Sequence, residues 1–95
     1  MNYLREFEIT DDVIEKIKKN NDKSIIQKLI YDEVNVGNVI NYLKSIDIEV
    51  IDELLISRPE FFSVDCEKIK KEFSKYNKEV LVNLINEDLN AINFL

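Results

Sequence analysis

The residues that could carry chemistry in this chain are mostly carboxylates and lysines. The sequence has no histidine, one cysteine and one glycine. These counts exclude a histidine general base, a zinc cluster within one chain and a glycine-rich phosphate-binding loop. Adjacent carboxylates, which can perform acid–base catalysis or bind divalent cations, occur at Asp11–Asp12, Asp32–Glu33, Asp52–Glu53 and Glu87–Asp88.

A structural role explains these carboxylate pairs better than a catalytic one. Asp11–Asp12 lies at an expected helix start, where negative charge is favourable, and the other pairs lie on expected solvent-facing helix surfaces. Cys66, in "VDCEK", is expected to be a small, half-buried helix residue rather than a reactive thiol. We therefore predict a protein without catalytic residues, without a metal site and without a cofactor.

The lysines are the best candidates for a binding role. An α-helix turns by about 100° per residue, so if Ile69 points inward, four lysines lie on the outer face of one expected helix. They are Lys68, Lys71, Lys75 and Lys78. A second group near the start of the chain comprises Lys16, Lys18, Lys19 and Lys23. If the two helices align, they form a basic stripe that could contact a phosphate backbone. We favour the alternative, a solvated surface with ion pairs four residues apart at Asp12–Lys16, Glu15–Lys19 and Glu67–Lys71.

Composition indicates one folded, acidic domain. Hydrophobic residues make up 45% of the 95 residues and charged residues 34%, which suits a core with a charged surface. The formal net charge of −6 disfavours a general affinity for nucleic acids and anionic membranes. No apolar run approaches the roughly 20 residues of a membrane span, and "MNYLREFEITDD" lacks the apolar stretch of a signal peptide. Together with the single cysteine, these features predict a cytoplasmic protein.

Apolar residues recur at spacings of three and four almost throughout, which is the period of amphipathic helices. The groups predict six short helices, around Val13–Ile17, Ile25–Ile30, Val39–Leu43, Val50–Leu55, Ile69–Tyr76 and Val80–Ile85. Tyr76 is expected to point inward. Turns are expected at 20–22, 35–38, 45–47 and 75–78, and the residues expected to cap or precede helices include Thr10 and Ser63.

A shift of 30 residues superimposes the third and fourth expected helices on the fifth and sixth. The shift pairs Val50 with Val80, Leu54 with Leu84, Leu55 with Ile85, and Phe62 with Ile92. The first part of the chain fits with a slightly shorter shift. We therefore predict an all-α fold of one domain, residues 1–95, with three tandem helix–turn–helix units over about 11–34, 38–62 and 64–95. The units form either a small right-handed-type solenoid or a compact bundle of six helices.

The only proline follows the fourth expected helix, in "LLISRPEFFSVD" (residues 54–65). Pro59 lacks a backbone N–H and disfavours helical geometry in Arg58, so the helix that contains Leu54 and Leu55 must end or kink there. Two phenylalanines follow and give the connector an apolar anchor. We expect Phe62 in the core and the connector as the joint between the second and third units.

Residues 39–71 resemble the repeat of the mitochondrial transcription termination factor (mTERF) family. They read VINYLKSIDIEVIDELLISRPEFFSVDCEKIKK. In that family's motif a helix ends in a short turn, a second helix carries paired leucines, and a proline precedes a short third helix. Here "LKSIDIEVIDELL" resembles the first two parts and "LLISRPEFF" the leucine–proline part, whereas the flanking units match by apolar pattern alone. The resemblance implies an all-α superhelix of triangular helical units that can bind nucleic acid.

The sequence favours a small, acidic helical-repeat module that binds a protein partner and has no catalytic activity. The alternatives are an mTERF-like, nucleic-acid-associated protein that uses the lysines, and an acidic inhibitor or antitoxin that occupies a partner's nucleic-acid site. The candidate contact residues are Lys16, Lys19, Lys23, Lys68, Lys71, Lys75 and Lys78, and the candidate structural residues are Leu54, Leu55, Pro59 and Phe62. Apolar residues near the two ends either cover the terminal units or form a surface for self-association; they are Tyr3, Leu4, Phe7, Ile92, Phe94 and Leu95.

Overall fold

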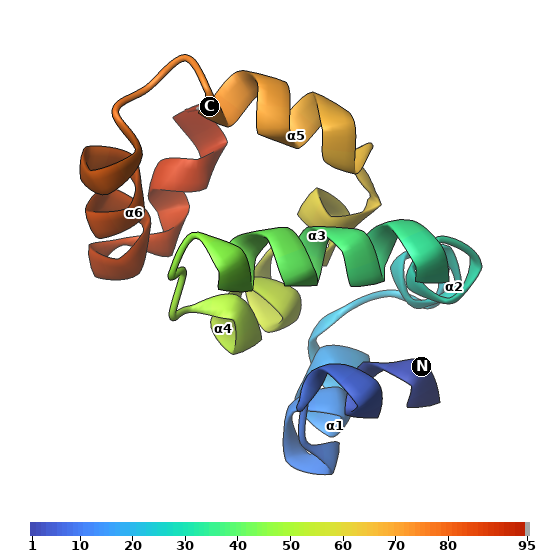
Figure 1. Cartoon of the computed structure of the whole chain (residues 1–95). Helices are drawn as coiled ribbons and strands as arrows, with labels where there is room; N and C mark the ends of the chain where they lie inside the picture. Colours follow the sequence, from blue (N-terminus) through green and yellow to red (C-terminus); the bar gives the residue numbers. More distant parts are fainter. Residues whose placement is uncertain (95) are drawn as a thin grey trace.

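Six α-helices and three short 3₁₀-helices make up the fold of residues 1–94, the part of the chain that the computed structural model describes (Figure 1). In chain order they are η1 (Asn2–Phe7), α1 (Asp11–Asn20), α2 (Lys23–Tyr31), α3 (Glu33–Ser45), α4 (Ile51–Ser57), η2 (Pro59–Ser63), α5 (Cys66–Phe73), α6 (Lys78–Glu87) and η3 (Leu89–Phe94). The prediction of an all-α fold is confirmed.

Side-chain caps begin three of the α-helices. Thr10 Oγ1 and Asn77 Oδ1 each accept a hydrogen bond from the N–H at the third helical position, at 3.3 Å in α1 and 3.1 Å in α6. Such a bond satisfies an N–H group that has no partner within the helix. Helix α5 is capped by Asp65, whose Oδ1 accepts an N–H from its first turn at 3.2 Å. Ser63, which the sequence places before this helix, instead ends η2.

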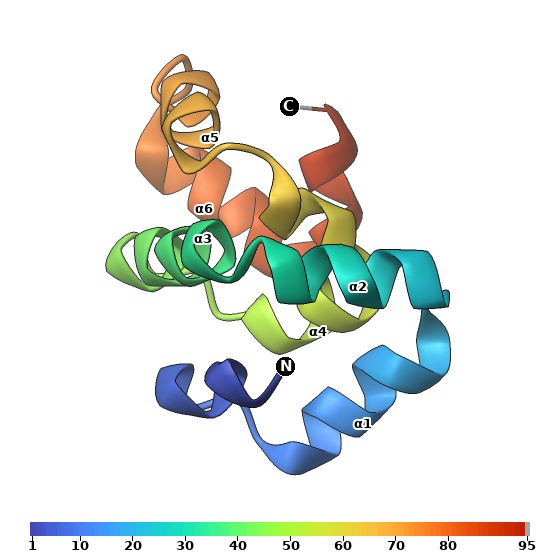
Figure 2. The same cartoon turned by 90° about the vertical axis from the view of Figure 1, so that its right-hand side faces the viewer.

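Helix α3 crosses the middle of the molecule, and the other elements pack around it (Figures 1 and 2). It contacts α2, α5, η1 and η2, while α4 contacts α1 and η2. In both views α1 and α5 lie at opposite ends of the molecule. The radius of gyration is 12.7 Å, within the roughly 12–13 Å that a compact domain of this length should have. The overall shape is therefore that of a compact globule.

The segment around the proline forms the centre of the core. Leu54, Leu55 and Phe62 are fully buried, as the sequence predicts. Helix α4 ends at Ser57, and the buried Pro59 begins η2. Proline suits this first helical position because its fixed φ matches the helix and its missing N–H would have no partner there. The predicted end of the helix before the proline is confirmed.

The turn predicted at residues 35–38 is wrong. These residues lie within α3, so the expected boundary between units 11–34 and 38–62 falls inside a helix. Gly37 is a buried helix residue, and a Cβ atom added to it would lie 2.7 Å from Cζ of Phe7. The glycine thus lets η1 pack closely on α3, where a side chain would displace the Phe7 ring.

The apolar surface of the last third of the chain is only partly covered. The prediction that Tyr76 points inward is wrong, because α5 ends three residues earlier and Tyr76 lies 46% exposed in the following turn. On α6, Leu81 and Ile85 are buried, but Val80 is 59% exposed and Leu84 50% exposed. The paired apolar pattern identifies the helix, whereas neighbouring elements decide which member of each pair is covered.

Two asparagine side chains tie together segments that are distant in the sequence. The amide nitrogen of Asn21, in the link after α1, donates to the Ile56 carbonyl in α4 at 3.0 Å. On α6, Asn86 accepts the Glu49 N–H at 2.7 Å and donates to the Asp47 carbonyl at 3.1 Å. These bonds hold α1 against α4 and hold the α3–α4 loop against α6.

Candidate functional site

The lysines form two separate groups. The first lies on α1 and at the start of α2, with Lys16, Lys18, Lys19 and Lys23. The second lies on α5, in the following turn and at the start of α6, with Lys68, Lys71, Lys75 and Lys78. Because α1 and α5 lie at opposite ends of the molecule, the fold does not join the two groups into one continuous stripe (Figures 1 and 2).

The second lysine group does not share one helix face either. Lys75 lies beyond the end of α5, and its Nζ atom is 3.1 Å from a carboxylate oxygen of Glu72. Lys78 lines a hollow beside the loop between α3 and α4, whereas Lys68 lines an apolar groove on another side. The predicted outer lysine face of a single helix is therefore wrong.

Ion pairs near the lysines are all on the surface. Asp12–Lys16 forms at 3.2 Å, as predicted. In place of the other two predicted pairs, residues 1–94 contain Glu67–Lys70 at 3.4 Å and Glu72–Lys75 at 3.1 Å, both three residues apart. Exposed pairs of this kind contribute about 0–1 kcal/mol to stability, so they leave the lysines available to a stronger anionic partner.

Apolar residues near the N-terminus cover the core. Leu4 is fully buried, and Tyr3 and Phe7 are half-buried against the core residues. Near the other end Ile92 is buried. These side chains act as covers for the terminal elements, which was one of the two predicted roles. The part of that prediction that concerns the side chains of residues 94–95 lies outside what the structure describes.

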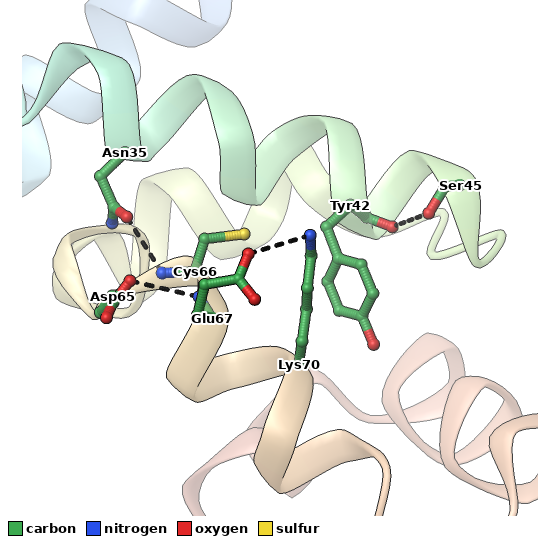
Figure 3. A network of polar contacts seen from close by, with 7 residues as sticks. All are labelled: Asn35, Tyr42, Ser45, Asp65, Cys66, Glu67 and Lys70. Atoms are coloured by element: carbon green, nitrogen blue, oxygen red, sulfur yellow. Dashed lines mark hydrogen bonds and ion pairs between the residues drawn. The ribbon is translucent and has the colours of Figure 1, made fainter.

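A polar hollow of about 410 Å³ lies between α3 and α5. It is lined by Asn38, Asn41, Tyr42, Ser45, Cys66, Glu67 and Lys70. Lys70 Nζ lies 3.4 Å from Glu67 Oε1 and 5.7 Å from the centre of the Tyr42 ring (Figure 3). The ring face attracts the ammonium group, so the cation of this hollow already has two partners within the chain.

The thiol of Cys66 lines this hollow. Cys66 is buried, and this burial raises the pKa of its thiol, while the nearby Lys70 opposes the rise. Burial likewise raises the pKa of Tyr42. A raised pKa keeps the thiol protonated near neutral pH, whereas the thiolate is the nucleophile and the metal ligand. The arrangement therefore suits a packing role for Cys66.

Asn35 is the residue of this region that sequence reasoning missed, because the apolar pattern places it in a turn. Its Nδ2 atom donates to the carbonyls of Phe62 at 3.0 Å and Val64 at 2.7 Å. Its Oδ1 atom accepts the Cys66 N–H at 3.0 Å, so the side chain also ties the first turn of α5 to α3 (Figure 3). Its partners lie 27 to 31 residues away, and no local pattern marks them.

An apolar groove of about 380 Å³ is bordered by η2, α5 and η3. Five apolar side chains line it together with Lys68 and Glu72; they are Phe61, Val64, Ile69, Phe73 and Ile92. The Phe61 and Phe73 rings stack with centroids 6.3 Å apart, and Val64 is 39% exposed. The phenylalanines after Pro59 could be predicted from the sequence as an apolar anchor. The groove also contains Ile92 of η3, however, and the sequence pattern does not show that η3 lies close to α5.

In residues 1–94, no three histidine, cysteine, aspartate or glutamate side chains lie together in a way that could hold a metal ion. None of the helices there is both long enough and apolar enough to cross a membrane.

Comparison of the chain with profiles of known protein families, with curated proteins and with solved structures finds no match. The resemblance of residues 39–71 to the mTERF repeat stays a prediction. A proposal for the function therefore rests on the surfaces of this chain.

Proposed function

We propose that the chain is a cytoplasmic, non-catalytic helical module that binds another protein through the apolar groove between η2, α5 and η3. The observation that carries this proposal is the lining of the groove, in which five of the seven side chains are apolar. Transfer of apolar surface out of water is the main driving force of most protein association. Binding sites of this kind take an aromatic or aliphatic anchor from the partner.

The size and charges of the groove indicate the kind of contact. A volume of about 380 Å³ lies near the lower end of the roughly 300–1,000 Å³ of pockets that bind small molecules, which is room for a side chain of a partner. Lys68 and Glu72 are one helical turn apart on α5 and place one charge of each sign beside the apolar lining. We therefore propose a partner segment with an apolar anchor residue flanked by polar or charged residues.

The polar hollow between α3 and α5 supports the non-catalytic part of the proposal. Its lysine is paired with Glu67 and lies over the Tyr42 ring, and its thiol has a raised pKa. A catalytic nucleophile needs the opposite conditions, a lowered pKa or an adjacent base. These side chains are better suited to joining α5 to α3.

The test is partner capture followed by a binding measurement on two matched variants. The immobilised full-length protein captures proteins from its source cells, and the Kd of each identified partner is measured by calorimetry. Val64→Glu places a carboxylate at an exposed position of the groove, and we expect it to weaken binding at least tenfold. Val34→Glu changes an apolar residue that is 78% exposed near the start of α3 and should leave the Kd unchanged.

Two results would contradict the proposal. One is equal affinity of the wild type and Val64→Glu for the captured partner, with both proteins folded by circular dichroism. The other is capture of no protein beyond those retained by an unrelated acidic protein of the same size.

A further inference from the structure

Helices α4 and α6 occupy corresponding places in two successive segments of the chain. A single residue separates each of them from the 3₁₀-helix that follows, and these 3₁₀-helices begin at residues 59 and 89. In each, a leucine carbonyl accepts a hydrogen bond from the N–H four residues later, at 2.7 Å for Leu54 and 3.0 Å for Leu84. The same 30-residue offset therefore relates the helix ends, the terminal hydrogen bonds and the following elements.

Three pairs of corresponding apolar residues are buried in both segments, whereas two other pairs differ in exposure. Residues buried in both segments are Ile51 and Leu81, Leu55 and Ile85, and Phe62 and Ile92. Leu54, in contrast, is fully buried, whereas Leu84 is 50% exposed. Val50 is half-buried, whereas Val80 is 59% exposed. The difference is thus confined to one face of α6.

The element that packs on each helix also differs between the two segments, because α1 packs on α4. Helix α1 is fastened there by the hydrogen bond from Asn21 to the Ile56 carbonyl. The 3₁₀-helices correspond as well, since η2 contacts α4 and η3 contacts α6. Within residues 1–94, no helix packs on α6 as α1 packs on α4, and α6 lies at the outer edge of the molecule (Figure 1).

We propose that the Val80–Leu84 face of α6 binds an amphipathic helix of a partner protein, in the place that α1 takes on α4. This assigns a second site, separate from the apolar groove, and it rests on the proposed function in taking the chain to be a binding module. The chain itself shows what such a helix presents, because α1 buries Val13, Ile14 and Ile17. The partner helix therefore carries aliphatic residues at positions i, i+1 and i+4.

Charge around the α6 face indicates that the partner helix is basic beside its aliphatic residues. Val80, Leu84 and Glu87 follow one another at i, i+4 and i+7 and so share one face of the helix. Glu87 is exposed and takes part in none of the ion pairs of residues 1–94, whereas Glu79 lines the hollow beside the α3–α4 loop. Lys78 lines the hollow beside the α3–α4 loop and is directed away from this face. Lysine or arginine on the partner would thus meet the unpaired carboxylate of Glu87.

A designed peptide tests this inference. The probe is a fluorescent peptide with the sequence of residues 9–22, in which Asp11→Lys and Asp12→Lys give it a basic end while its aliphatic residues are kept. Fluorescence anisotropy with the full-length protein should show saturable binding, and Leu84→Glu should weaken it at least tenfold. Val34→Glu is the control for an exposed apolar residue elsewhere and should bind as the wild type does. A second peptide with serine at the positions of Val13, Ile14 and Ile17 should not bind.

Two outcomes would overturn the inference. One is equal binding of the aliphatic and serine peptides to the wild type, up to about 1 mM. The other is equal binding of the peptide to the wild type and Leu84→Glu, because the peptide would then bind at a place other than this face of α6. If Leu84→Glu fails to fold, Val80→Glu replaces it, since Val80 is even more exposed.

The outcome for α6 is separable from the outcome for the groove. Loss of peptide binding in Leu84→Glu, together with unchanged partner binding in Val64→Glu, would support the α6 site and contradict the proposed function. Unchanged peptide binding in Leu84→Glu, together with weakened partner binding in Val64→Glu, would contradict the α6 site alone.

Discussion

The Tyr3 hydroxyl donates a hydrogen bond to the Leu29 carbonyl at 2.6 Å, which joins η1 to α2. Burial, and then the nearby carboxylates of Glu33 and Asp32, raise the pKa of Tyr3 from 10.0 to about 12. The folded protein therefore holds this proton more tightly than the unfolded chain does. Above pH 10.0 the unfolded chain binds fewer protons, so the contribution of Tyr3 to stability is full below that pH and is lost as the pH rises through about 12.

We expect the stability difference between the wild type and Tyr3→Phe to show this dependence on pH. At neutral pH the variant lacks the hydrogen bond to Leu29 and should unfold with a free energy about 1 kcal/mol lower than that of the wild type. Between neutral pH and about pH 11 this difference should shrink, because phenylalanine has no proton to lose. Urea unfolding of both proteins at several pH values measures it, and a difference that stays constant with pH would contradict the assignment.

At the scale of elements, local signals predicted where helices lie, and tertiary contacts decided how they are covered. Thr10 and Pro59 act on their own chain neighbours, so the start of α1 and the end of α4 could be predicted. Gly37 suggested a turn, because the sequence does not show that the Phe7 ring, 30 residues earlier, packs against it. The exposure of Leu84 could not be predicted from the sequence either, because it depends on which elements pack against α6.

The contact of α3 with the segment after Pro59 should depend strongly on Asn35. Asn35→Ala removes three hydrogen bonds and leaves the carbonyls of Phe62 and Val64 and the Cys66 N–H without these partners. At about 1 kcal/mol for each bond, we expect a loss of about 2–3 kcal/mol in the free energy of unfolding.

Asn38→Ala is the matched control for this prediction. Asn38 lies one turn later on the same helix and is exposed, so its replacement should change stability by less than about 0.5 kcal/mol. Urea unfolding gives both values. Equal effects of the two substitutions would show that the Asn35 hydrogen bonds do not hold α3 to η2 and α5.

At the scale of the whole molecule, the fold separates charges that the sequence pattern could have united. The first lysine group lies on α1 and the second around α5, with α3 and α4 between them (Figures 1 and 2). The carboxylates outnumber the basic residues by 19 to 13, which gives the formal net charge of −6. We therefore expect a long polyanion to contact one lysine group at a time, while the net negative charge of the protein repels it.

This placement predicts weak nucleic-acid binding with a shallow dependence on salt. Each phosphate contact contributes about −0.9 to the slope of log K against log salt for duplex DNA. One group of three or four lysines would give a slope of about −3 to −4, whereas the seven candidate lysines in one stripe would give about −6. We expect little binding of a labelled duplex at about 50 mM salt, and a slope no steeper than about −4 where binding is detected. A slope near −6 that becomes shallower when either lysine group is replaced by alanine would show that one nucleic acid contacts both groups. This result would contradict the prediction, because α1 and α5 lie at opposite ends of the molecule.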